Sequence, residues 1–176
     1  GASHWYYESV DGRIFRSLAS PGAIGAFAGA VLLSNLSTSA AKDWISALLL
    51  IMGLLLIART LTFKIPAPSK EAGRKLLLPL GVVGGFIDAT GGGGWGPVVT
   101  PTLLTVTGSQ PRQIIGTVSA SEFLVALAAS IGFLIALPWD QICWGVVDGL
   151  AIGGALAAPI AARSVAQFPR RVLGLL

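Results

Sequence analysis

Long apolar blocks, separated by short polar loops, occupy most of this chain. Four of them are long enough for a transmembrane helix, which needs about 20 apolar residues to cross the hydrocarbon. Two further blocks, Leu76–Ile87 and Val98–Val106, are too short to cross alone and are joined by a run of glycines. The pattern predicts an all-α, polytopic transmembrane helix bundle with spans at Ile14–Leu33, Trp44–Leu61, Ile114–Leu137 and Ile142–Ala162.

Composition supports a membrane protein and narrows its partners. The chain is 53% hydrophobic and only 11% charged, whereas soluble domains carry roughly 25% charged residues. A single cysteine, Cys143, and a single histidine, His4, exclude disulfide frameworks and Cys/His metal sites. We therefore expect no metal and no cofactor. The net charge of +4 is spread over loops that flank apolar blocks, which is typical of membrane topology and predicts no nucleic-acid partner.

The glycine run interrupts the apolar pattern. Six glycines lie between Gly84 and Gly94, and each costs about 1 kcal/mol relative to alanine in a helix interior. Irregular backbone at membrane depth survives only where protein buries it or where it lines an aqueous cavity. We interpret Leu76–Val106 as a glycine-broken re-entrant hairpin, which passes halfway into the membrane and returns.

Charge placement favours the same hairpin. The linker 63–75 and the loop 163–171 are both basic, so both should be cytoplasmic. Two spans lie between them, an even number, which leaves room only for a segment that does not cross. Gly108–Gln113 would then be cytoplasmic and the turn at Asp140 external.

A weak internal repeat suggests how the chain is organised. Gly25–Ala30 resembles Gly154–Pro159, and the predicted topology gives the two copies opposite directions. Inverted repeats are a recurring transporter plan, although small-residue patterns are also common at membrane helix contacts. We assign 1–62 to the second half of repeat 1 (two transmembrane helices), 63–75 to a cytoplasmic linker and 76–176 to repeat 2. Repeat 2 holds the hairpin 76–106, helices 114–137 and 142–162, and the start of another helix at 172–176.

The hairpin carries a family resemblance. Gly84-Gly85-Phe86-Ile87-Asp88-Ala89, the following Gly91-Gly92-Gly93-Gly94-Trp95-Gly96-Pro97, and later Gly116-Thr117-Val118-Ser119 resemble the TauE/SafE family of membrane anion (sulfite) exporters. The resemblance implies a secondary transporter that exports a small sulfur-containing oxyanion across the inner membrane, and not an enzyme. It also implies that the chain is a C-terminal portion truncated at both ends, so that missing parts of its own full-length chain are among its partners.

The glycine loop offers a physical site for such an anion. Consecutive amides without side chains form anion-binding concavities, and Pro97 stands at the first helical position that proline favours. The helix from Val98 would then present its positive N-terminus near the midplane. The alternative is that the glycines only allow helices to pack closely. The predicted ligands of a small inorganic or organosulfur anion are Gly91, Gly92, Gly93, Gly94, Trp95, Gly96, Pro97, Thr117, Ser119 and Ser121.

Two acidic residues have two interpretations each. Glu122 lies inside a predicted span and Asp88 ends the first half-helix, and ionisable groups at such depth are functional candidates. Each either couples proton movement to the anion or holds the glycine loop through its amides. Other function classes stay open: an intramembrane enzyme that binds a phosphate or lipid headgroup, or a non-transporting structural subunit. Against the enzyme, no Lys-Ser/Thr follows the glycines as in a P-loop.

Overall fold

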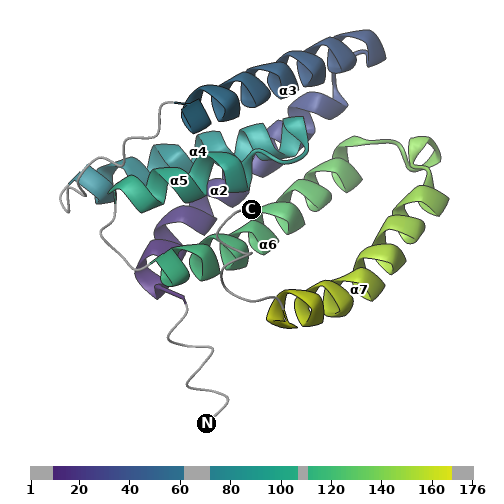
Figure 1. Cartoon of the computed structure of the whole chain (residues 1–176). Coiled ribbons are helices and arrows are strands. Elements are labelled where there is room, and N and C mark those ends of the chain that lie inside the picture. Colours follow the sequence, from purple (N-terminus) through teal and green to yellow (C-terminus); the bar gives the residue numbers. More distant parts are fainter. Residues whose placement is uncertain (1–9, 62–71, 107–110, 168–176) are drawn as a thin grey trace. The chain divides into compact units, whose positions relative to one another are not determined.

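The computed structural model describes residues 10–61, 72–106 and 111–167, and every regular element in them is a helix. The expected all-α fold is confirmed. The chain forms two compact units, one up to Leu137 and one from Pro138 onward, and each is described by itself. In chain order the helices are α2 (Gly12–Ser34), α3 (Thr38–Leu61), α4 (Ala72–Gly91), α5 (Trp95–Val106), α6 (Pro111–Ala136), the 3-10 turn η1 (Trp139–Gln141) and α7 (Trp144–Gln167) (Figure 1).

Three helices in the described residues are long and apolar enough to cross a membrane. They are Gly12–Ser34, Thr38–Ala58 and Gln113–Ala136, which overlap three of the four predicted spans. The first and third agree with the prediction within two residues at each end, whereas the second begins six residues earlier than predicted. The fourth prediction falls on α7, whose described apolar part, Trp144–Ala157, is shorter. Helix ends commonly vary by a residue or two between definitions, so the agreement lies in the number and order of the elements.

Helix α2 is the centre of the first unit. It packs against α4 on one side and α6 on another, and α5 contacts both α4 and α6. Its start is fixed by Asp11, whose carboxylate accepts hydrogen bonds from the backbone N–H groups of Arg13 and Ile14 at 2.9 and 3.2 Å. The N–H of Asp11 donates to the Thr117 hydroxyl at 2.9 Å. The N-terminal cap therefore also ties α2 to α6.

The contact between α2 and α4 is built from glycines. A Cβ added to Gly25 would overlap the carbonyl oxygen of Val82, and one added to Gly85 would overlap the carbonyl oxygen of Gly22. The two backbones therefore touch without intervening side chains. Such small-residue contacts are a common basis of helix association in membranes, where dispersion and close approach replace the hydrophobic effect.

Helices α4 and α5 form a helical hairpin, and the break between them is shorter than the sequence predicts. Helix α4 continues through Gly84 and Gly85, so these two glycines do not end it. They are instead positions where a side chain would meet Trp95 or α2. The break itself is Gly92–Gly94, after which α5 turns back alongside α4 (Figure 1). Helix α5 has 12 residues, about 18 Å at 1.5 Å per residue, which is less than the roughly 30 Å of hydrocarbon. Helix α4 has 20 residues, about 30 Å, so it is not the half-length helix that the sequence predicts over Leu76–Ile87.

Two further boundaries differ from the sequence prediction. Residues 72–75 of the predicted linker belong to α4. Helix α5 begins at Trp95 instead of Val98, so Pro97 is its third residue and not its first. Proline is still accommodated there because first-turn N–H groups have no partner within a helix. His4, the linker residues 63–71 and the predicted helix start at 172–176 lie outside the described residues.

Candidate functional site

Asp88 holds both sides of the helix break. Its carbonyl oxygen accepts the N–H of Gly92 at 2.8 Å, which closes the last turn of α4. Its carboxylate accepts the N–H of Trp95 at 2.9 Å, at the first residue of α5. A carboxylate in this place satisfies an otherwise unpaired donor and complements the positive end of the helix dipole. This side chain caps α5 at Trp95, two residues before the proline.

The loop between the helices requires glycine conformations and exposes amides. Gly92 has a φ of 73° and Gly93 a φ of 151°, which L-residues with side chains rarely adopt. Both are exposed, whereas Gly94 is buried against Ile87. Within the part of the chain that the structure describes, the N–H groups of Gly93, Gly94 and Gly96 have no hydrogen-bond acceptor. Amides without partners on a bare backbone can receive an anion.

Trp95 anchors this loop to the helices beneath it. Its side chain is 0% exposed, and its indole N–H donates to the carbonyl oxygen of Val118 in α6 at 3.3 Å. The ring lies against Gly22 and Gly84, where an added Cβ would come within 2.5 and 3.4 Å of it. In this conformation Trp95 forms a wall under the loop, and a movable gate would require its removal from the core.

The hydroxyl groups predicted to bind the anion occupy two faces of α6. Thr117 and Ser121 share a buried face, as their spacing of four predicts. Their hydroxyls donate within α6: Thr117 to the carbonyl of Gln113 at 2.7 Å, and Ser121 to those of Thr117 and Val118 at 2.9 Å. Ser119 is exposed on another face. An anion could use the Thr117 or Ser121 hydroxyl hydrogen only after these bonds are exchanged.

The remaining predicted residues lie around the same loop. Gly91 ends α4 and is half-buried, and Gly96 and Pro97 are half-buried in the first turn of α5. Asp88 is half-buried and Glu122 is exposed. The structure thus brings together the glycine loop, the Asp88 carboxylate and, through Trp95, the α6 backbone.

Sequence reasoning missed the partners of Trp95. The Val118 acceptor is a main-chain carbonyl, which no side-chain pattern reveals, and Gly22 and Gly84 were interpreted only as parts of a small-residue helix and a helix breaker. The sequence feature that could have indicated these partners is a large side chain, Trp95, next to many glycines that leave space for it. The described residues contain no group of three His, Cys, Asp or Glu side chains that could hold a metal ion.

Comparison with known proteins adds three findings. The sequence model of a family described as "Sulfite exporter TauE/SafE" matches residues 1–176. The chain is 47% identical over 179 residues to the "Probable membrane transporter protein YtnM" of Bacillus subtilis (strain 168). This match covers 100% of the chain and 60% of the relative, so the chain spans less than two thirds of that protein's length. No solved structure matches the chain significantly.

Proposed function

The chain belongs to the TauE/SafE sulfite exporter family, and on that premise we propose that it forms part of a multi-pass membrane transporter that exports a small sulfur-containing oxyanion. The observation that carries the proposal is the turn between α4 and α5, where the N–H groups of Gly93, Gly94 and Gly96 have no acceptor among the described residues. Backbone amides and a helix N-terminus are a suitable environment for an oxyanion. This family and this relative favour a transporter over an enzyme.

In this proposal the anion competes with the Asp88 carboxylate for the amides at the start of α5. This carboxylate already occupies the Trp95 N–H at the start of α5, so an oxyanion that binds the neighbouring amides meets a negative charge there. We include Glu122, an exposed carboxyl group on α6, as a second negative charge that the anion would meet. Protonation of either carboxyl group would relieve the repulsion. We propose that the two groups link proton uptake to anion binding, while Asp88 also serves as the structural cap of α5.

A binding titration tests the amide site. Sulfite and sulfate are titrated into purified protein, and wild type is compared with Gly93→Val. The valine disfavours the loop conformation and shields the amides, and loss of one charged hydrogen bond should weaken the affinity about 10-fold or more. Gly53→Ala is the matched control, because an added Cβ there meets nothing within 4 Å. Equal affinity of wild type and Gly93→Val would refute the amide site, and the transport proposal would then rest on the family alone.

Transport measurements at different pH gradients test the carboxyl groups. Asp88→Asn keeps an oxygen that can accept the Trp95 N–H but removes the charge, so anion affinity should rise and its dependence on the gradient should fall. Glu122→Gln, on the exposed face of α6, should keep anion binding and lose part of the gradient dependence. If both variants show wild-type dependence and stability, neither carboxyl group couples protons.

The membrane topology is proposed with the function. We place the protein in the inner membrane with the linker 63–75 and the loop 163–171 in the cytoplasm, because both are basic. With Cys143 replaced, cysteines at Ser69 and Ser109 should react with an impermeant thiol reagent only from the cytoplasmic side. A cysteine at Asp140 should react from outside. External labelling at Ser109 would mean that the hairpin crosses the membrane, and the inverted repeat would be lost with it.

A further inference from the structure

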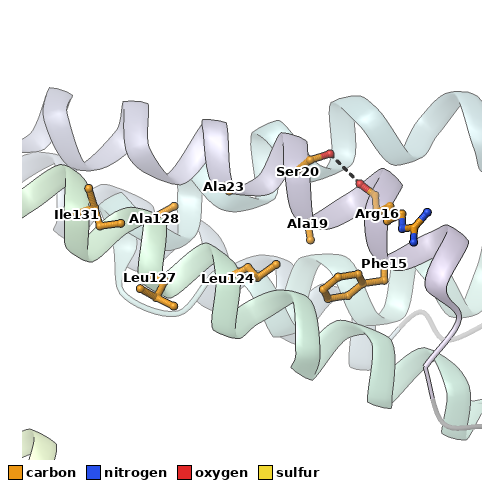
Figure 2. A pocket seen from close by; sticks show the side chains of 9 residues that line it. All are labelled: Phe15, Arg16, Ala19, Ser20, Ala23, Leu124, Leu127, Ala128 and Ile131. Atoms are coloured by element: carbon orange, nitrogen blue, oxygen red, sulfur yellow. Dashed lines mark hydrogen bonds between the residues drawn. The ribbon is translucent and has the colours of Figure 1, made fainter. Parts of the chain in front are cut away.

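A groove of about 530 Å³ follows the outer surface of α2 and α6, away from the glycine loop. Figure 2 shows Phe15 and Arg16 at one end and Ile131 at the other. Small residues of α2, Ala19 and Ala23, line it between these ends. From residue 15 to residue 23 the groove runs about 12 Å along the helix. It is an elongated apolar trough with one charged end.

The depth of the groove in the membrane follows from the two helices that form it. Both α2 and α6 are long and apolar enough to span. The apolar side chains on the α6 side, Leu124, Leu127 and Ile131, are 40%, 43% and 46% exposed, so they are accessible from outside the first unit. The part of the groove that lies along these spans is therefore inside the hydrocarbon layer, where lipid acyl chains are the solvent.

The charged end lies where a lipid headgroup would be. Arg16 is in the second turn of α2, close to the end of the span and hence to the membrane surface. Its guanidinium forms no ion pair or hydrogen bond among the described residues, and the Ser20 hydroxyl donates to the main-chain carbonyl oxygen of Arg16 at 2.7 Å. Arg13, also exposed, lies one turn earlier on the same helix. Guanidinium groups bind phosphate oxygens in a planar, bidentate way.

We propose that this groove binds one anionic phospholipid, with an acyl chain in the trough and the phosphate on Arg16. The order of the lining matches a lipid in its natural orientation, cation at the membrane surface and apolar side chains below it. A basic residue at the membrane surface contributes about 1 kcal/mol to attraction of an anionic lipid. The lining of this groove includes no residue of the glycine loop. The lipid proposal can therefore be tested separately from the proposal on the transported anion.

Native mass spectrometry of the purified protein tests the headgroup. Dioleoyl-phosphatidylglycerol and dioleoyl-phosphatidylcholine are added at equal concentrations, and one bound phosphatidylglycerol should be retained preferentially. Arg16→Gln should reduce its retention about 5-fold. Lys42→Gln, which removes an exposed cation from α3, is the control and should change nothing. Equal retention of the two lipids, or of phosphatidylglycerol in wild type and Arg16→Gln, would overturn the proposal.

A second pair of variants tests the trough. Ala23→Leu fills the groove and should abolish lipid retention, whereas Ala126→Leu, on an exposed part of α6 outside the groove, should leave it intact. A benzophenone amino acid in place of Leu127 then identifies the occupant in native membranes. An adduct with the mass of a phospholipid supports the proposal. A cross-link to a protein segment, or lipid retention unaffected by Ala23→Leu, contradicts it.

Discussion

The glycines between α2 and α4 and the glycines of the loop between α4 and α5 serve opposite needs. At Gly25 and Gly85 the backbone is ordinary helix, and what matters is the space, because a methyl group would overlap a carbonyl oxygen of the facing helix. At Gly92 and Gly93 the space is open, with no atom within 4 Å of an added Cβ. There the φ angles of 73° and 151° are what exclude other residues.

This difference separates packing from function. Glycines that allow two backbones to touch stabilise the unit, and they can be placed wherever two helices cross. Glycines with unusual φ values in an exposed turn contribute little packing. The loop retains amides without acceptors, and such groups need a reason at membrane depth. We propose ligand binding for Gly92 and Gly93, whereas the glycines of the α2/α4 contact serve helix association.

The largest effect is expected at the helix contact. Gly25→Ala or Gly85→Ala forces α2 and α4 apart, because the overlapping atom is backbone and cannot rotate away. Overpacking of this kind costs about 3 kcal/mol. Thermal unfolding of the purified protein in detergent measures it, with Gly53→Ala as the control. If Gly25→Ala and Gly85→Ala melt within a degree of wild type, the glycines of the α2/α4 contact do not differ from those of the loop.

A smaller loss of packing is expected at the wall under the loop. Trp95→Phe keeps most of the buried ring but removes the hydrogen bond to the Val118 carbonyl. Unfolding free energy should fall by about 1–2 kcal/mol, from the lost bond and the space left by the indole. Trp139→Phe is the matched control, since Trp139 is exposed in the other unit. If both variants unfold alike, Trp95 is not the anchor of the loop.

Substitution of a loop glycine should lower stability through backbone strain alone. Gly93→Ala introduces a side chain at a φ of 151° without any steric neighbour. The expected loss is about 1–2 kcal/mol, with unchanged helix content by circular dichroism. Anion affinity should fall more than stability does, because the amides are displaced. A loss of stability as large as that of Gly25→Ala would show that the loop is also a packing element.

Removal of the Asp88 cap of α5 should lower the unfolding free energy by a smaller amount. Asp88→Ala leaves the Trp95 N–H without its acceptor, and loss of an N-terminal cap costs about 1 kcal/mol. Asp88→Asn should recover most of it. Both are measured by chemical unfolding in the same detergent. If the alanine variant matches wild type, the turn between α4 and α5 is held by Trp95 and not by Asp88.

The smallest change is a gain. Gly53→Ala in α3 meets no atom within 4 Å, and alanine is favoured over glycine in a helix interior by up to about 1 kcal/mol. Unfolding should therefore shift slightly upward. A loss instead would mean that α3 packs closely against something beyond the described contacts of this unit, and Gly53 would then belong with Gly25 and Gly85.

The sequence by itself determined the class of the protein and the position of its unusual segment. Length and continuity of apolar blocks predict spans because the hydrocarbon thickness is fixed, and three of the predicted spans overlap helices that are long and apolar enough to cross. The glycine run predicted a broken helix after α4, and the break is there. Thr117 and Ser121 share a buried face because a helix repeats every 3.6 residues.

Only the tertiary structure decided which glycines break a helix and what holds the break. Gly84 and Gly85 were counted with the loop, yet they lie inside α4 because Trp95 and α2 need the space above them. Helix α5 starts at Trp95 and not at Val98, and its first N–H is accepted by the Asp88 carboxylate, a contact across seven residues. The local sequence pattern gives only the tendency of a segment to form a helix. Whether a glycine is packed in a helix or lies in a loop depends on which other helix faces it. That neighbour comes from elsewhere in the chain, so only the folded arrangement supplies it.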